Sequence, residues 1–158
     1  MPEESFTHLD DRGAAHMVDV SGKDISARTA TAAGRVNVSG EVVRLLRDEA
    51  LPKGDALAVA RIAGIMAAKR TPDLVPLCHP IALHGVDVDL EVDDTGVEIR
   101  ATVRTADRTG VEMEALASVV VAGLAFIDMV KAVDPAAVIN DVRVLTKTGG
   151  KTGDWSRT

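Results

Sequence analysis

The order of patterns along the sequence predicts an α+β fold, in which helices cover one face of a ferredoxin-like antiparallel sheet. A segment rich in β-branched residues at positions 26–38 comes first, and an alternating hairpin occupies positions 85–105. Two helical segments that are apolar on almost every side precede and follow this hairpin. Because the hairpin has one apolar and one charged face, we expect the helices to pack on the apolar face.

The length and composition of the chain fit a single domain. Its 158 residues, of which 46% are hydrophobic, are enough for one compact core. We expect a partly ordered polar arm at residues 1–25, one α+β domain at residues 26–146 and a mobile tail rich in Gly and Lys at residues 147–158. The N-terminus lacks a signal-peptide pattern, and no apolar run is expected to reach membrane-spanning length. These features favour a cytoplasmic protein without membrane contacts.

The composition argues against several classes of function. A net charge of −6 disfavours broad binding of nucleic acid, which needs a basic face. Aromatic residues make up only 2% of the chain, so a platform that stacks several bases is not expected. The single cysteine can form neither an internal disulfide nor a zinc site made of cysteines. Helices that are apolar nearly all round favour burial between subunits, so we expect an oligomer.

The first half of the chain is expected to form a strand and two capped helices. The β-branched residues at 26–38 favour the strand, and Ser39 is placed to cap the helix GEVVRLLRDEA. Asp55 is placed to cap a second helix, ALAVARIAGIMAAKR. Within this helix, Gly64 allows another backbone to approach closely, and Pro72 follows the predicted end.

The second half is expected to hold an extended segment, the hairpin, a long helix and a last strand. Prolines in LVPLCHPIAL, residues 74–83, disfavour helix in the residues before them, so this segment is expected to be extended. The hairpin carries acids on the outer face of its first strand and arginines on that of its second. Thr109 and Glu112 fit a capping box for a helix at residues 110–133, and the last strand is expected at residues 138–145.

Cys78 and His79 are adjacent, and this raises the question of a nucleophile or a metal site. Successive side chains of an extended segment point to opposite sides, so the two are not expected to form a dyad. Cys78 is most simply a small buried hydrophobic residue, and His79 is then an exposed group that can face a pocket. A metal site would need His8, His16 or Asp19 to be brought to His79 by the fold.

Two further positions allow both a structural and a functional interpretation. Asp128 lies in an otherwise apolar helical segment, with Lys131 three residues later on the same face. They form either a structural ion pair or an acid–base pair in a pocket. Glu114 precedes Asp128 by roughly 21 Å along the helix, so one subunit cannot easily bring both to the same bond. Lys53, just before a helix N-terminus, is either an exposed turn residue or part of an anion site.

The C-terminal segment TGGKTGD superficially resembles a phosphate-binding loop. The Walker A pattern requires a glycine five positions before Gly150, but this position is Leu145, and no helix-forming run follows Lys151. The segment is therefore either a solvated tail or a lid whose Lys147 and Lys151 close on a phosphate.

Seven stretches in register carry a resemblance to one known family: AHMVDVSGK, LPKGD, ARIAGIMAAKRT, LVPLCHP, TGVEMEAL, IDMVKAV and KTGGKTGDW. They resemble the molybdenum-cofactor biosynthesis protein C family, the cyclic pyranopterin monophosphate synthases. The resemblance runs from about Thr7 to Trp155, which is nearly the whole chain. Each motif alone is weak, whereas seven in the same order are highly specific.

The resemblance implies a lyase of molybdenum cofactor biosynthesis with a ferredoxin-like fold and residues 26–146 as its catalytic domain. The substrate would be (8S)-3′,8-cyclo-7,8-dihydroguanosine triphosphate, and the products would be cyclic pyranopterin monophosphate and pyrophosphate. The assembly would be a homohexamer, a trimer of dimers, with sites at the dimer interfaces. No cofactor or metal would be bound by the protein, and any Mg²⁺ would accompany the triphosphate.

The resemblance also implies roles for individual residues. Asp128 would be the catalytic residue, with Lys131 beside it and Lys53 completing the catalytic group. The substrate would be bound by the following residues: Leu77, Cys78, His79, Glu112, Met113, Glu114 and Lys147. The residue before the aspartate is often tyrosine in this family but is Ile127 here, and the chain has no tyrosine, so a phenol cannot be essential to its chemistry.

Two other functions remain open on the sequence alone. A non-catalytic oligomeric sensor of nucleotides or pterins on the same fold would use the lysines for binding only. A metal-dependent phosphohydrolase would rely on His8, His16, Asp19 and His79.

Overall fold

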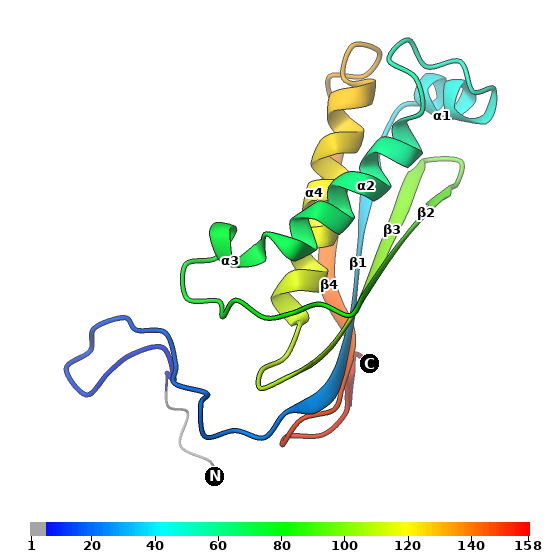
Figure 1. Cartoon of the computed structure of the whole chain (residues 1–158). Coiled ribbons are helices and arrows are strands. Elements are labelled where there is room, and N and C mark those ends of the chain that lie inside the picture. Colours follow the sequence, from blue (N-terminus) through cyan, green and yellow to red (C-terminus); the bar gives the residue numbers. More distant parts are fainter. Residues whose placement is uncertain (1–5) are drawn as a thin grey trace.

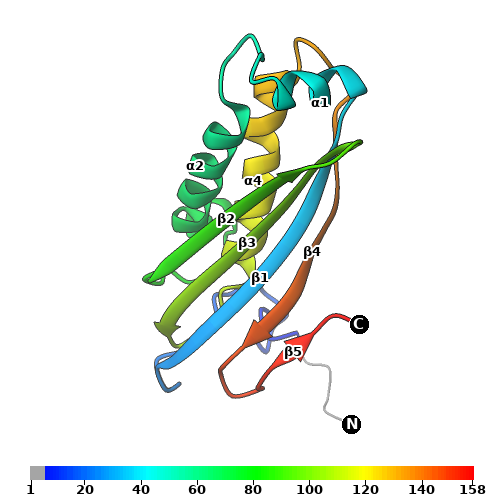
Figure 2. The ribbon, with the colours of Figure 1, turned by 90° about the vertical axis from the view of Figure 1, so that its right-hand side faces the viewer.

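The computed structural model describes residues 6–158, and residues 1–5 of the expected N-terminal arm lie outside the described part. One antiparallel five-stranded sheet, with strand order β2-β3-β1-β4-β5, is covered on one face by helices (Figures 1 and 2). The elements are β1 Ser26–Asn37, α1 Gly40–Arg47, α2 Ala56–Lys69, α3 Thr71–Leu74, β2 Gly85–Val92, β3 Gly96–Asp107, α4 Glu112–Val130, β4 Val138–Thr148 and β5 Trp155–Ser156. The predicted α+β class with an antiparallel sheet and covering helices is therefore confirmed.

Strand β1 forms the centre of the sheet, and its small side chains determine how closely the helices approach. It pairs along its whole length with β3 and is bonded to β4 on its other side. Its core residues Ala30, Ala32 and Ala33 are at most 1% exposed. At Gly34 a Cβ atom would lie 2.7 Å from a methyl carbon of Val119 in α4. The absence of a side chain there lets α4 lie directly on the sheet.

Helices α2 and α4 pack side by side over the sheet (Figure 1). The predicted caps form: the Asp55 side chain accepts from the Ala58 amide of α2, and Ser39 caps α1. At Gly64 a Cβ atom would lie 3.0 Å from the Ser118 carbonyl oxygen, which confirms the predicted close approach. Phe126, the largest fully buried side chain, fills the space between α4 and its neighbours.

One local prediction is wrong, and one short helix was not predicted. Helix α4 begins at Glu112 with Val111 as its N-cap, and no side chain caps it, so Thr109 and Glu112 form no capping box. Glu112 is itself the first helical residue and therefore cannot occupy the third position that a capping box requires. The four-residue helix α3 was not predicted either. Pro72 lies in its first turn, where a missing amide proton costs nothing, and the Thr71 hydroxyl donates back to the end of α2.

The C-terminal strands differ from the predicted strand at residues 138–145. Strand β4 continues to Thr148, and β5 returns to pair with it through Lys147–Trp155 and Thr146–Ser156 (Figure 2). Between them the chain turns through Gly149, Gly150 and Gly153, all at positive φ. The tail at residues 147–158 thus contains paired backbone next to the sheet, while its mobility stays a prediction.

Helix α4 corrects the expectation that no segment reaches membrane-spanning length. In residues 6–158 it is the one helix that is long and apolar enough to cross a bilayer, with a mean hydropathy of 1.9. It contacts α2, β1, β3 and β4, which is the position of a helix in the core of a domain. Length and composition alone therefore say little about a membrane here.

Candidate active site

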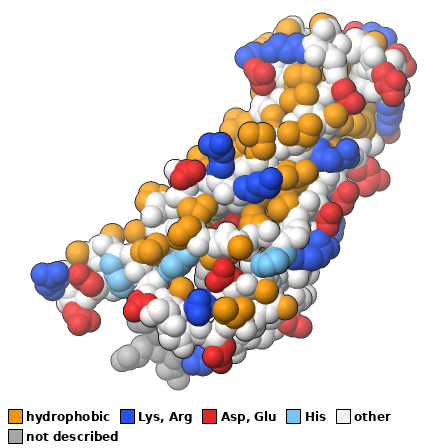
Figure 3. Space-filling model, in the orientation of Figure 1, with side chains coloured by type: hydrophobic (Ala, Val, Ile, Leu, Met, Phe, Trp, Pro, Cys, Tyr) orange, Lys and Arg blue, Asp and Glu red, His pale blue; other side chains and the backbone are white. Residues whose placement is uncertain are grey.

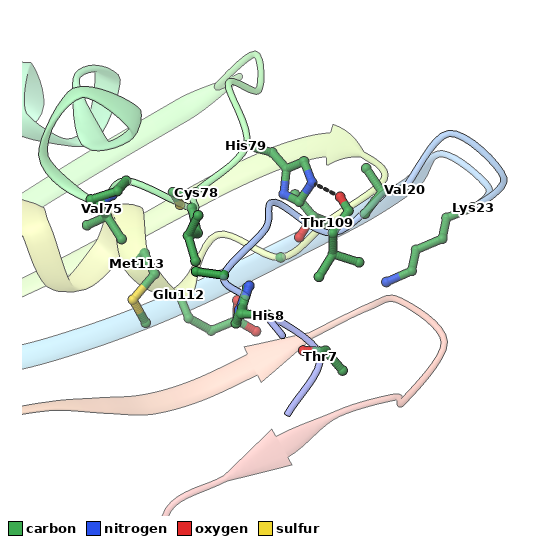
Figure 4. Close-up of a pocket in the computed structure, with 15 residues that line it drawn as sticks. Thr7, His8, Val20, Lys23, Val75, Cys78, His79, Thr109, Glu112 and Met113 are labelled. Atoms are coloured by element: carbon green, nitrogen blue, oxygen red, sulfur yellow. Dashed lines mark hydrogen bonds between the residues drawn. The ribbon is translucent and has the colours of Figure 1, made fainter. Parts of the chain in front are cut away.

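A cavity of about 720 Å³ lies at the N-terminal end of α4 (Figure 4). Three segments enclose it: the N-terminal arm, the stretch before β2 and the loop that leads into α4. Its lining residues are Thr7, His8, Ala15, Val18, Val20, Lys23, Val75, Pro76, Leu77, Cys78, His79, Thr109, Gly110, Glu112 and Met113. The cavity thus gathers residues that are far apart in the sequence.

The stretch at residues 75–80 forms one wall of this cavity. Cys78 donates through its Sγ to Glu114 Oε1 at 3.7 Å. The His79 imidazole makes a short contact with the Val18 carbonyl oxygen of the arm (Figure 4). The two side chains thus have partners on different elements, as the prediction of no dyad requires. Both are half-buried, so the expectations of a buried cysteine and an exposed histidine are wrong. Their polar partners explain the difference, because each holds its side chain at the edge of the cavity.

Glu114 lies behind this wall and is not one of the cavity-lining residues. It is 2% exposed, and its Oε2 atom has no hydrogen-bond partner among residues 6–158. Burial raises the pKa of Glu114 above its usual range. Burial and the neighbouring carboxylate of Glu114 raise the pKa of Cys78 to about 11, so the thiol keeps its proton at neutral pH.

Glu112 and Lys147 meet beside the cavity. Lys147 Nζ in β4 lies 3.6 Å from Glu112 Oε1, and both side chains remain partly exposed. At Gly110 a Cβ atom would lie 2.2 Å from a Glu112 carboxylate oxygen, so a larger residue there would make the flexible Glu112 side chain shift. The ion pair with Lys147 holds the Glu112 carboxylate next to β4.

A second group of charged residues forms at the opposite end of α4. Lys131 Nζ lies 2.8 Å from Asp128 Oδ1, and Lys53 Nζ lies 3.5 Å from Asp128 Oδ2 and 3.0 Å from the Asp128 carbonyl oxygen. The hydrogen bond from Lys131 and the charges of both lysines lower the pKa of Asp128. The turn that carries Lys53 needs Gly54, whose φ of 101° favours glycine. All three side chains are accessible, with 44–58% of each exposed.

The structure therefore divides the predicted site residues into two groups on one chain. Leu77, Cys78, His79, Glu112 and Met113 line the cavity, Glu114 contacts its wall, and Lys147 is paired to Glu112. Asp128, Lys131 and Lys53 form the second group, in which Asp128 lies fourteen residues further along α4 than Glu114. At the rise of an α-helix this separation is roughly 21 Å.

Residues of the arm were missed as part of the cavity. Thr7, His8, Val18, Val20 and Lys23 line it, although no helix or strand forms in the described part of the arm, residues 6–25. Two signals in the sequence pointed to the arm: the apolar residues in a polar segment, and the stretch AHMVDVSGK, residues 15–23, which carries part of the family resemblance. In residues 6–158 no three His, Cys, Asp or Glu side chains lie close enough to share a metal ion, so His8, His16, Asp19 and His79 are not gathered into one ligand set.

These features define a class of protein. A small α+β scaffold presents carboxylates and an imidazole at one cavity and an aspartate between two lysines at an open surface. Side chains of these kinds are those that an acid–base enzyme needs to act on an anionic small molecule.

Comparison with known proteins identifies the family. The MoaC family model matches residues 17–150, and the chain belongs to the MoaC family. A cyclic pyranopterin monophosphate synthase of Streptomyces coelicolor is 69% identical over 156 residues, which cover 99% of this chain and 92% of that protein. The protein of the same name from a Nocardioides species is 70% identical over 96% of this chain and 95% of its own length. Cyclic pyranopterin monophosphate synthase 2 of Mycobacterium tuberculosis is 62% identical over 96% of this chain and 91% of its own length.

Proposed function

We propose that the chain is a cyclic pyranopterin monophosphate synthase of molybdenum cofactor biosynthesis. It converts (8S)-3′,8-cyclo-7,8-dihydroguanosine triphosphate to cyclic pyranopterin monophosphate and releases pyrophosphate. The names of its relatives support this assignment. The structural observation that carries it is the ion-pair group of Lys53, Asp128 and Lys131, because the reaction needs both a proton-transfer group and cations.

Asp128, Lys131 and Lys53 are the catalytic residues of this proposal. Rearrangement of a purine-derived ring requires proton transfers, which a carboxylate and an adjacent ammonium can perform. The lowered pKa of Asp128 keeps this carboxylate ionised near neutral pH, where it either accepts a proton or stabilises the protonated form of Lys131. Attack of a ribose oxygen on the inner phosphorus forms the cyclic phosphodiester and expels pyrophosphate. The developing charge is stabilised by lysines already in place.

The cavity at the other end of α4 binds the substrate in this proposal. Leu77, Met113 and the Cys78 side chain offer an apolar surface to the ring, and His79 and Glu112 offer polar contacts. Lys147 supplies a further cation beside the cavity. The leaving group, pyrophosphate, is an anion. We therefore expect Lys147 to contribute more to anion binding than to folding.

One site therefore takes its two halves from two subunits. The roughly 21 Å between Glu114 and Asp128 is too long for one reacting bond, but a neighbouring copy can bring its own Asp128 to the cavity. Large hydrophobic side chains are exposed along the helical layer, among them Ile62, Met66 and Leu124, which supports burial against another subunit (Figure 3). We assign the assembly as a homohexamer, a trimer of dimers with sites at the dimer interfaces.

Further assignments follow from the same family. The first four strands have the order β2-β3-β1-β4, which supports a ferredoxin-like core to which α1 and β5 are added. The protein holds no cofactor of its own in this proposal, and any Mg²⁺ arrives with the triphosphate. The enzyme works in the cytoplasm on a small molecule and contacts neither nucleic acid nor membrane.

Turnover of the cyclised nucleotide by the purified chain tests the proposal. We expect Asp128→Ala and Lys131→Ala to bind the nucleotide but to form no cyclic pyranopterin monophosphate, as followed by chromatography of the product. Asp48→Asn is the matched control, because Asp48 makes only an exposed helix pair with Arg44. Wild-type protein that binds the nucleotide without turning it over would instead support the sensor function. Full turnover by both variants would contradict the catalytic assignment.

A further inference from the structure

The contact between Cys78 and Glu114 joins the cavity wall to α4. The Glu114 carboxyl group is 2% exposed, its Oε1 accepts the thiol hydrogen bond at 3.7 Å, and its Oε2 has no partner among residues 6–158. A buried polar atom without a hydrogen-bond partner destabilises a fold, so its presence calls for an explanation. The partner that it does have is a residue of the cavity wall.

The cavity-lining part of the wall is held by few hydrogen bonds, while Ile81 and Leu83 further along pack against the core. Residues 75–84 lie outside all helices and strands. A backbone bond from the Cys78 amide to the Val75 carbonyl holds one end, and a bond from the His84 amide to the Arg104 carbonyl holds the other. Between them, Ala82 accepts from the Thr105 hydroxyl. The cavity-lining part is therefore fixed to α4 by the Cys78 thiol and to the arm by the His79 imidazole.

We propose that Glu114 is a positioning residue, which acts on the cavity through Cys78 by accepting the thiol hydrogen bond. Successive side chains of this extended stretch point to opposite sides, so drawing Cys78 toward α4 turns His79 toward the arm. The pair thereby fixes the direction of the imidazole and the depth of the wall. Only the activity measurements below rest on the proposed function.

The state of the thiol agrees with this role. Burial, the Glu114 carboxylate and the more distant Glu112 raise the pKa of Cys78 to about 11, so the thiol remains a donor at neutral pH. A thiol that keeps its proton is a poor nucleophile. The pair is thus unreactive at neutral pH, and it affects the cavity through the position of the wall.

The reactivity of the thiol provides a test that needs no enzymatic activity. Cys78 is the only cysteine, so the rate of its alkylation by iodoacetamide can be measured on the intact protein across alkaline pH. We expect Glu114→Gln to lower the thiol pKa and to speed alkylation near pH 9, by about tenfold for each unit of the shift. Glu41→Gln removes an exposed carboxylate on α1 and is expected to change nothing. An unchanged profile in Glu114→Gln would overturn the proposed contact.

A double-mutant cycle on kcat/KM tests the positioning role. We expect Cys78→Ala and Glu114→Ala each to lower kcat/KM by about tenfold, and the double variant to be no worse than either, because all three remove the same contact. Glu114→Gln should recover most of the activity that Glu114→Ala loses, since its amide oxygen can accept the thiol hydrogen bond.

Three outcomes of the cycle are informative. Losses that multiply to about a hundredfold would show that Glu114 acts independently of Cys78 and would overturn the inference. So would a Glu114→Gln variant as inactive as Glu114→Ala. If Glu114→Ala does not fold, the cycle is run with Glu114→Gln. The variant that combines Glu114→Gln with Cys78→Ala should then be as active as Cys78→Ala alone. A wild-type protein without turnover contradicts the proposed function, while the alkylation profile still decides on the pair.

Discussion

Mixing two inactive variants provides the sharpest test of a site shared between subunits. Asp128→Ala removes the carboxylate at one end of α4, and Glu112→Ala removes a cavity carboxylate at the other end. If each site takes Asp128 from one subunit and Glu112 from the other, neither variant alone has an intact site. A mixed dimer has one site with both residues native and one site with both replaced.

The expected activity follows from counting. When the two variants are combined in equal amounts and assemble at random, about half of the dimers are mixed, and each has one intact site of two. The mixture should therefore recover about one quarter of wild-type turnover. Glu112 and Asp128 are sixteen residues apart on α4, which is roughly 24 Å at the rise of an α-helix. This separation requires the sharing, because a single chain cannot bring both residues to one bond.

Coexpression of the two variants with different affinity tags provides the assay. Mixed oligomers are selected through both tags, and product formation is compared with that of each variant alone. Turnover of the mixture that stays at the level of the separate variants would refute the shared site, since it would mean that both residues serve the same site from one chain. Wild-type chains with the two tags control for effects of the tags on assembly.

Three further changes have expected outcomes. Phe126→Ala leaves a cavity in a fully buried position and should lower the free energy of unfolding by about 3–5 kcal/mol in urea denaturation. Gly64→Val should lower the melting temperature, because even a Cβ atom there would lie 3.0 Å from the Ser118 carbonyl oxygen of α4. Lys53→Met removes one of the two cations beside Asp128, so the lowered pKa of Asp128 should rise and the acid limb of the kcat profile should move to higher pH.

Two of these changes have a control variant. Gly22→Ala meets no atom within 4 Å and should leave the melting temperature unchanged, unlike Gly64→Val. Arg12→Met removes an exposed cation on the arm and should leave the acid limb in place. An acid limb that stays fixed in Lys53→Met would mean that Asp128 is not the group that titrates, and a Phe126→Ala variant of native stability would mean that its site collapses without cost.

The fold was predictable wherever a local pattern coincided with the tertiary structure. Alternation in the hairpin gave β2 and β3, and the side chains of Ser39 and Asp55 gave two helix starts. The capping box failed although its pattern was present, because α4 begins at Glu112 with Val111 as its N-cap, and the Glu112 carboxylate pairs with Lys147 instead. Local patterns describe what a residue can do, whereas its tertiary neighbours decide which option it takes.

The sequence pointed to part of the candidate site, but not to the arm residues of the cavity or to the arrangement of the site. The Asp128–Lys131 pair could be anticipated from helical spacing alone. The Cys78–Glu114 contact joins residues 36 positions apart, and the contact of His79 with the arm joins residues 61 positions apart. No periodicity records such contacts, so the cavity became visible only when the chain was folded.

Strand β5 gives this protein a built-in optical reporter. Trp155 is the only tryptophan, the chain has no tyrosine, and its backbone pairs with Lys147 beside the cavity. The indole is 42% exposed and has the Arg157 guanidinium 5.5 Å from its ring centre. Emission excited near 295 nm therefore originates from a single position, on the strand that pairs with the Lys147 end of β4. A change in its wavelength or anisotropy on adding a nucleotide would report on this edge of the sheet without any label.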